Sequence, residues 1–271
     1  MTLIERAHAA TSRPITWTLA TACLAALLPT AASAVPMVEA PSFRDEVSYL
    51  TFTIDHHYSA LRLTELAAGT AAVGSSSNYA GAPDVFPSSP AKATNPVALT
   101  NAVMPNRGQR MEILEGQDLL RSLYGVNYTP SFQPYFLPLT TALEQAPAGD
   151  AFNIAYLEIF SGHHATLTPS SEQCAAAAPN AAVRTYCNGI ATTQTREISE
   201  MRTELAATYG ITSISYETIP LPASVTGTAV PEPASAALFA AGALALGLVR
   251  NRQGTTRGLP DCLPAPTDRP S

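Results

Sequence analysis

The sequence predicts an all-α protein, a bundle of four helices arranged as two hairpins. The pattern Tyr-Leu, five residues, His-His occurs twice, at residues 49–57 and 156–164, and accounts for four of the five histidines. Each copy is followed by a Gln-x-x-Glu-Ile-x-Glu string, at residues 109–115 and 194–200. Two pairs of helices, each with a His-His dyad and a strip of Gln and Glu, are the simplest interpretation of this double recurrence.

The first helix is expected between Arg44 and Ala68, because this stretch contains no proline or glycine. Apolar residues and one histidine recur there at three- and four-residue steps, which places them on one helical face and predicts that His56 points inward. Residues 69–96 that follow are rich in Gly, Ser, Ala, Asn and Pro and have no apolar periodicity. They are expected to form an inserted loop with little regular structure.

The second helix is expected from Val97 to Leu123, with a kink near Pro105 and Gly108. Gln109, Glu112 and Glu115 fall on one side of it. Residues 124–147 are rich in proline and aromatic residues and are predicted to be an irregular connection.

The third helix is expected to begin near Asp150, a suitable N-cap, and it repeats the spacing of the first helix with Tyr156, Ile159 and His163. The fourth is expected from Asn180 to Tyr209, ended by Gly210.

The two halves can be aligned if the inserted loop is removed. His56 and His163 are 107 residues apart, whereas Gln109 and Gln194 are 85 apart, and the difference corresponds to the loop at 69–96. The repeats then cover residues 43–124 and 150–209. Two amphipathic hairpins bury their apolar faces most simply against each other, which predicts a four-helix bundle with approximate twofold symmetry in a domain covering residues 35–229.

The N-terminal 34 residues have the features of a secretory signal peptide. Arg6 and Arg13 precede an apolar stretch at 15–28, and Ala32-Ser33-Ala34 forms an A-x-A cleavage site. Cys23 could be a lipoprotein cysteine, but Ala20 is smaller than the aliphatic residue that such sites prefer three positions earlier. We therefore expect cleavage after Ala34 and export to the periplasm, cell envelope or extracellular matrix.

The C-terminal region carries Val-Pro-Glu-Pro-Ala-Ser at 230–235, an apolar run to Val249 and then Arg250 and Arg252. This arrangement resembles a PEP-CTERM sorting signal, which implies recognition by an exosortase-type processing enzyme through residues 230–252. The apolar run is shorter than the roughly 20 residues that span a bilayer comfortably, although a plain membrane helix is the alternative. Membrane contact is expected only through this segment, and the tail at 253–271 is expected to be disordered.

Charge and cysteine content restrict the partners and the compartment. The formal net charge is −6 and Lys92 is the only lysine, so nucleic acid is not expected as a partner, whereas cations would be attracted. Ordinary solubility accounts for such a charge equally well. Cys174 and Cys187, thirteen positions apart, are expected to form a disulfide in an exported protein, with a pair of thiolate metal ligands as the alternative.

The strings Asp150-x-Phe152-x-x-x-Tyr156-Leu157 to His163-His164 and Gln194-x-x-Glu197-Ile198-x-x-Met201 resemble the ferritin-like bacterial family called domain of unknown function 305. The resemblance extends over about residues 43–209 and is clearest in the second half. Some exported members of that family bind copper and are implicated in metal tolerance. The resemblance therefore implies a ferritin-like, metal-binding bundle outside the cytoplasm.

This chain departs from the family at the methionines. Members usually carry methionines before and after the His-His pair, where this chain has Phe52-Thr53 and Ile159-Phe160, followed by Leu63 and Ser170. Gly116 replaces the methionine of the first Gln-x-x-Glu-Ile-x-x-Met string. Because thioethers favour Cu(I), a site of imidazole and carboxylate is better suited to Cu(II), zinc or iron.

The candidate site follows from helix geometry. Adjacent helical residues diverge by about 100 degrees, so the two histidines of one dyad cannot easily bind one ion. We expect one histidine of each dyad to face the interior and the other to lie at its edge, with His56 and His163 on the better developed apolar face. Glutamates of the partner helices would complete the site, with Gln109 and Gln194 as hydrogen-bond donors to the ligands. The predicted ligands of a copper or zinc ion are His56, His57, His163, His164, Glu112 and Glu197.

Two other interpretations of the same residues are open. The histidines could be satisfied inside the bundle by Gln and Glu without a metal, and the protein would then be a non-catalytic structural or extracellular-matrix protein. An enzyme is not expected, because no glutamate stands three residues before a histidine of the two dyads, as in the Glu-x-x-His ligands of di-iron oxidases. The Gly-x-Ser-x-Gly elbow and the His-Glu-x-x-His motif do not occur either. The predicted function is that of an exported protein that binds a transition metal for sequestration or tolerance.

Overall fold

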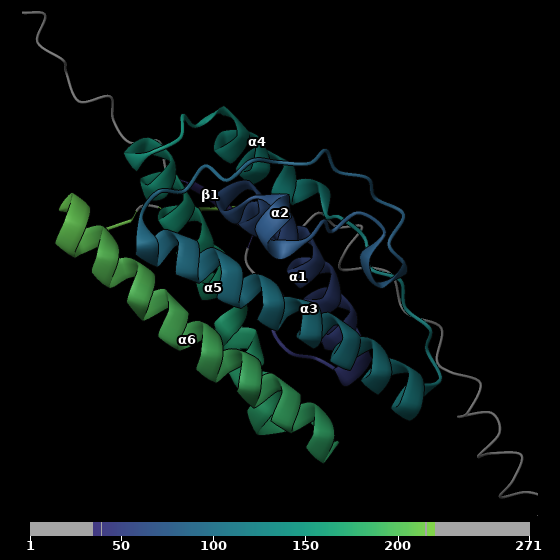
Figure 1. Ribbon diagram of the computed structural model, residues 1–271. Helices are drawn as coiled ribbons and strands as arrows, with labels where there is room; N and C mark the ends of the chain where they lie inside the picture. The colour runs from purple at the N-terminus through teal and green to yellow at the C-terminus, as the bar shows by residue number, and fades with distance from the viewer. Residues whose placement is uncertain (1–34, 39, 215, 220–271) are drawn as a thin grey trace, which may run out of the picture. The chain divides into compact units, whose positions relative to one another are not determined.

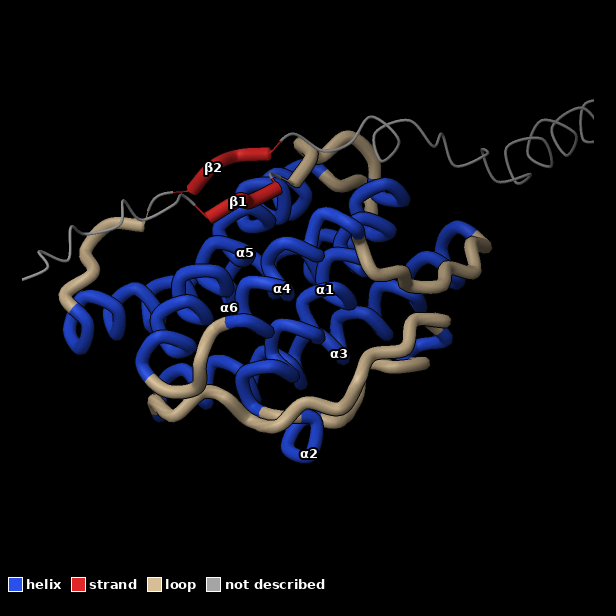
Figure 2. Tube along the Cα trace, turned by 90° about the horizontal axis from the view of Figure 1, so that it is seen from above, coloured by secondary structure: helices blue, strands red, loops and turns tan. Residues whose placement is uncertain are grey.

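The computed structural model describes residues 35–38, 40–214 and 216–219, and its core is all-α, as predicted (Figures 1 and 2). The predicted signal peptide at 1–34, the sorting signal at 230–252 and the tail at 253–271 lie outside the described residues. Four long helices form a bundle: α1 (Glu46–Ala68), α3 (Pro96–Tyr124), α5 (Asp150–Ala177) and α6 (Ala181–Tyr209). No helix within the described ranges is long and apolar enough to cross a membrane.

The ends of the long helices follow the expected local signals. Asn180 caps α6 by accepting a hydrogen bond from the amide of Ala182, and Gly210 ends it in the left-handed conformation with φ of 71°. Asp150 is the first residue of α5 and not its N-cap, a position that Gly149 occupies. The helix α3 is continuous across Pro105.

Residues 124–147 form more regular structure than the sequence predicts. They contain the 3-10 turn η2 (Pro134–Phe136) and a further helix, α4 (Leu137–Gln145), so the prediction of an irregular connection is wrong. The helix is formed because Leu139 and Leu143, four positions apart, are buried against the bundle. Lys92 then donates hydrogen bonds to the carbonyls of Leu143, Glu144 and Ala146 at the end of α4.

Short elements complete the described chain. The inserted loop contains one turn of helix, α2 (Thr70–Val73), and one 3-10 turn, η1 (Tyr79–Gly81), and is otherwise irregular, as expected. Two short strands, β1 (Val35–Val38) and β2 (Tyr216–Ile219), pair in parallel with Val35 opposite Tyr216. Figure 2 shows this pair beside α5. The strands bring the two ends of the described chain together on one side of the bundle.

The directions of the helices follow from contacts between them. Residues at the start of α1 contact the end of α3, because Tyr124 donates a hydrogen bond to Glu46, and Asn106 reaches Thr64 further along. Tyr49 on α1 contacts Ser171 near the end of α5 at 2.8 Å. The helix α1 is therefore antiparallel to both α3 and α5, and these two are parallel to each other across a diagonal of the bundle.

A disulfide joins the second pair of long helices near their connection. Cys174 of α5 and Cys187 of α6 are bonded, as predicted, and both are fully buried. A cross-link of this length reduces the conformational freedom of the unfolded chain and contributes roughly 3 kcal/mol to stability. It also fixes α5 and α6 as an antiparallel hairpin.

The helix α1 is enclosed on all sides, since every residue from Phe52 to Ala68 is buried. The other long helices cover one face, and irregular segments cover the rest. Asp55, for example, accepts hydrogen bonds from the amide of Ser131 at 2.9 Å and from the side chains of Tyr128 and Gln133 at 2.8 and 2.7 Å. This carboxylate holds the segment that follows α3 against α1.

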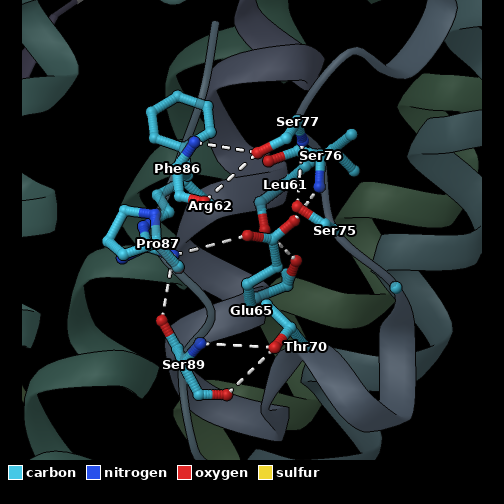
Figure 3. Close-up of polar contacts among 12 residues, drawn as sticks. Leu61, Arg62, Glu65, Thr70, Ser75, Ser76, Ser77, Phe86, Pro87 and Ser89 are labelled. Carbon is cyan, nitrogen blue, oxygen red and sulfur yellow. Dashed lines mark hydrogen bonds and ion pairs between the residues drawn. The ribbon is translucent and has the colours of Figure 1, made fainter.

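A buried ion pair on α1 holds the inserted loop (Figure 3). Arg62 donates hydrogen bonds of 2.9 Å to the carbonyl of Pro87 and the hydroxyl of Ser89. Glu65, which is fully buried, accepts a hydrogen bond from the amide of Ser76 and lies 3.5 Å from Arg62. The loop is thus attached to the bundle at both its beginning and its end.

We predict that Glu65→Ala lowers the free energy of unfolding by about 1–3 kcal/mol, because it removes the acceptor of the Ser76 amide and the carboxylate that lies 3.5 Å from Arg62. Arg62 retains its contact of 2.9 Å with Glu144, which limits the loss. Chemical denaturation followed by circular dichroism measures this change. The exposed Glu172→Ala on α5 is the control and should change stability by less than about 0.5 kcal/mol. A loss for Glu65→Ala no larger than that of the control would contradict the anchoring role of Glu65.

Candidate metal centre

Four histidines lie together in the middle of the bundle, His56 and His57 on α1 and His163 and His164 on α5. Each of them is at most 2% exposed. The expectation that one histidine of each dyad lies at the edge of the interior is therefore wrong. Both helices are surrounded by protein at this level, so two successive side chains that point in different directions are both buried.

The second histidine of each dyad faces the predicted glutamate. His57 Nδ1 lies 3.4 Å from Glu112 Oε2, and His164 Nδ1 lies 3.3 Å from Glu197 Oε2. Neither contact has the alignment of a hydrogen bond, and both Nδ1 atoms are buried without a hydrogen-bond partner. From the sequence, His56 and His163 were the histidines expected to point inward towards the site, whereas the glutamates contact His57 and His164. We call these two contacts the His–Glu pairs.

The two glutamines connect the hairpins across the diagonals of the bundle. The side-chain amide of Gln194 on α6 lies 3.1 Å from His57 Nε2 on α1. That of Gln109 on α3 lies 3.3 Å from His164 Nε2 on α5. Each glutamine therefore reaches the histidine of the other hairpin, at the ring nitrogen opposite the one that faces a carboxylate. Both Oε1 atoms are buried without a partner.

His56 and His163 form a separate central pair. Their rings are stacked with centroids 4.0 Å apart and planes inclined by 15°. Phe136 meets both rings with its edge at 5.5 Å. Since neither ring contacts a carboxylate, the structure divides the six predicted ligands into two His–Glu pairs and one His–His pair.

Burial changes the protonation of the His–Glu pairs. It lowers the pKa of His57 and of His164 to about 3. It raises the pKa of Glu112 to about 7, helped by the charge of Glu115, and that of Glu197 to about 8, helped by the charge of Glu112. Near neutral pH each pair consequently tends to hold one proton, on the carboxyl group, beside a neutral imidazole.

The spacing of each His–Glu pair equals the separation of two ligands on one ion. Ligands at zinc distances of about 2.0–2.1 Å in a tetrahedral arrangement are about 3.3 Å apart. However, no three His, Cys, Asp or Glu side chains within the described part of the chain are grouped around one point. Each pair offers two such ligands, and a full coordination sphere would need other donors, such as an amide oxygen or water.

Packing explains why a methionine of the related motif is missing from the first hairpin. A side chain at Gly116 would meet Ile54 at 3.0 Å and the hydroxyl of Tyr186 at 3.1 Å, so α3 approaches its neighbours too closely for a methionine. The corresponding Met201 on α6 is fully buried. The two hairpins thus place similar polar groups at the centre but differ in the residues packed around them.

Two residues near the histidines were not predicted from the sequence. A cavity of about 10 Å³ adjoins His56 and His163 and is also lined by Met37 of β1 and Tyr135 of η2. Met37 precedes the first helix in a segment without periodicity, and Tyr135 lies in the proline-rich connection. Their positions depend on how these segments pack on the bundle, for which the sequence carried no signal.

Comparison with protein families supports the resemblance in the second half of the chain. Residues 139–205 match the family described as domain of unknown function (DUF305). The matched part includes α5, most of α6 and the residues His163, His164, Gln194 and Glu197. Searches among curated proteins and among solved structures found no match.

We predict that the two glutamates make the metal-free protein less stable as the pH rises. Because the folded-state pKa of each carboxyl is raised above 4.5, the folded protein retains protons that the unfolded chain has released, and stability falls as the pH rises above about 4.5. The fall ends when the folded carboxyls have themselves ionised, at about pH 7–8, so the interval from about pH 6.5 to 8 covers its last part. Glu112→Gln combined with Glu197→Gln removes this effect. Between about pH 6.5 and 8 the wild type should lose roughly 1–2 kcal/mol of unfolding free energy relative to the double variant.

Urea denaturation at several pH values measures that difference, with Glu172→Gln as the control. Comparing wild type with the double variant cancels the contribution of the histidines, whose lowered pKa acts in the opposite direction, favouring folding as the pH rises from about 3 towards 6.5. Parallel pH profiles for wild type and double variant would show that the carboxyl groups ionise normally in the folded protein.

Proposed function

We propose that this is an exported protein whose bundle binds a divalent transition metal, copper(II) or zinc, at the two His–Glu pairs, for sequestration or tolerance. The proposal rests mainly on one observation. In each pair a buried imidazole nitrogen faces a carboxylate oxygen at 3.3–3.4 Å without a hydrogen bond. Two ligands of one ion have this separation and this lack of direct bonding.

Unsatisfied polar atoms favour a ligand over a purely structural core. Nine buried side-chain nitrogen and oxygen atoms in the described part of the chain have no hydrogen-bond partner, and six of these belong to the four histidines and two glutamines. Native proteins leave few such atoms, because each costs about 1–3 kcal/mol. Their concentration at one place is typical of a site that binds an ion or ordered water.

Charge is consistent with a cation at each pair. Burial disfavours a charged carboxylate and raises the pKa of Glu112 and Glu197, so each retains a proton to a higher pH than an exposed glutamate does. A divalent ion bound to the same oxygen and to Nδ1 of the histidine takes the place of that proton. Binding should therefore release protons and become stronger as the pH rises from 6 to 8.

The glutamines are suited to support such an ion. Coordination by Nδ1 requires the ring proton to be on Nε2, and ligand histidines commonly donate this proton to an oxygen acceptor. Gln194 lies at Nε2 of His57 and Gln109 at Nε2 of His164. Rotation of each amide by half a turn presents its oxygen to the ring, so the same contact serves both the metal-free and the metal-bound tautomer.

The type of bundle and its internal repeat are part of the same proposal. We infer that the bundle is ferritin-like and built from two repeats. In support, the long crossover at residues 125–149 joins two parallel helices, α3 and α5, a connection typical of ferritin-like bundles. The distances of 3.4 and 3.3 Å in the two His–Glu pairs, one in each hairpin, support the repeat.

Export and processing are proposed from the two ends of the sequence. The disulfide between Cys174 and Cys187 is typical of an oxidising compartment and supports export. The Pro-Glu-Pro segment at 230–252 would be read by an exosortase-type processing enzyme, and membrane contact would occur only there. Within this proposal the bundle stores or delivers an ion and catalyses no reaction.

Metal titration of the full chain, purified without a histidine tag and stripped with a chelator, tests the proposed function. We predict that up to two Zn(II) or Cu(II) ions bind, measured by calorimetry and elemental analysis. Glu112→Gln combined with Glu197→Gln should weaken binding at least tenfold, because it removes the charged ligand from each pair while preserving its shape.

The matched control is Asp118→Asn combined with Glu172→Gln, which removes two exposed carboxylates from α3 and α5 that do not act on Glu112 or Glu197. It should bind as the wild type does. Equal affinities for the wild type and the Glu112/Glu197 variant would exclude the His–Glu pairs as the site. If the wild type bound no ion and its melting temperature did not respond to metal, a structural or matrix protein would be the better description.

A further inference from the structure

The central His–His pair differs chemically from the two His–Glu pairs. The cavity beside it is lined by His56 and His163 together with Met37, Tyr135, Phe136, Leu139 and Thr166. No acidic residue is among the described residues that line it. A divalent ion there would have no negative charge beside it, which makes this cavity less favourable than the His–Glu pairs for such an ion.

The donor atoms of the cavity are available. Nδ1 of His56, Nδ1 of His163 and the hydroxyl of Tyr135 are all buried without a hydrogen-bond partner. His56 is 2% exposed, His163 1% and Met37 3%. The volume of about 10 Å³ corresponds to one water molecule or one small ion. A thioether and two neutral imidazoles are the donors that a soft, singly charged ion prefers.

We propose that His56, His163 and Met37 form a second metal site that binds a soft monovalent ion, Cu(I). The site deepens the proposed metal-binding function and rests on it only in assigning the protein a role with metals, since its ligands are different. Met37 supplies a thioether beside the histidines, where the His-His motifs of this chain have no methionine. Met37 comes from β1, which packs against α4 and α5 and is held by its pairing with β2.

Binding requires a rearrangement of the stacked rings. Parallel rings with centroids 4.0 Å apart direct their lone pairs along parallel planes, so one ring must turn before both nitrogens meet one ion. The adjoining cavity is the free space into which such a turn is possible. Loss of the stacking is therefore a distinctive sign of occupation of this site.

Ag(I), a redox-inert ion with the ligand preference of Cu(I), is the probe. We predict that one equivalent of Ag(I), added to the full chain with ¹³C-labelled methionine methyl groups in chloride-free buffer, shifts the methyl resonance of Met37. Met104 and Met111 should be unaffected at this stoichiometry, because each is exposed to solvent and offers a single thioether. The ring protons of His56 and His163 should shift at the same time as the stack opens.

Met37→Leu, which preserves size and apolar character, should weaken Ag(I) binding at least tenfold, whereas Met111→Leu should leave it unchanged. If Met37→Leu does not fold, the wild-type spectrum decides, with the Met37 methyl assigned through its contacts to Leu139. An unshifted Met37 methyl, or Ag(I) binding that is equal in both leucine variants, would overturn the proposal and leave the cavity as a place for a water molecule.

The same preparation separates this proposal from the function proposed above. Zn(II) binding that depends on Glu112 and Glu197, together with no response of Met37 to Ag(I), would refute the soft site alone. A response of Met37 to Ag(I) without any Zn(II) or Cu(II) binding would refute the divalent sites alone.

Discussion

The side chains of α1 from Phe52 to Ala68 are all shielded from solvent, so each polar group among them must find its partner inside the protein. Asp55 binds the segment after α3, and Arg62 and Glu65 bind the inserted loop. His57 meets α3 through Glu112 and α6 through Gln194. Burial of one polar helix thereby determines where two irregular segments and two neighbouring helices lie.

The second hairpin has the same polar residues at its centre, but different segments pack on its outer side. On α5, the glutamate of α6 meets His164, as Glu112 of α3 meets His57 on α1. The helix α4 packs against both α1 and α5, whereas β1 packs against α5 and the inserted loop is held by α1. Because these segments differ, the central His–His pair is open to a small cavity on the side of Met37 and Tyr135. The resemblance between the hairpins is thus strongest where they face each other.

The buried centre combines polar groups whose burial lowers the stability of the fold. Two carboxyl groups have raised pKa values, four imidazoles are held neutral, and two amide oxygens lack partners. Such groups lower stability unless another interaction compensates for their burial. The disulfide on the second hairpin and the ion pair that holds the inserted loop are stabilising interactions outside this centre. They allow the bundle to hold polar residues in its interior.

Local signals in the sequence were sufficient for the long helices. Periodicity located α1, Asn180 and Gly210 located the ends of α6, and the spacing of Cys174 and Cys187 predicted their bond. These features depend on residues close together in the chain, where helix geometry relates spacing directly to position. The prediction that glutamates of the partner helices approach the His-His dyads followed from the same geometry.

Which histidine meets which glutamate was decided by the packing of separate segments. Periodicity favoured His56 and His163, but α1 and α5 face each other through these two rings, which leaves His57 and His164 directed towards α3 and α6. The helix α4 and the position of Met37 beside the rings were likewise not predictable, because both depend on apolar surface supplied by distant residues. Sequence spacing specifies the face of a helix, whereas the partner of that face depends on contacts that only the folded chain contains.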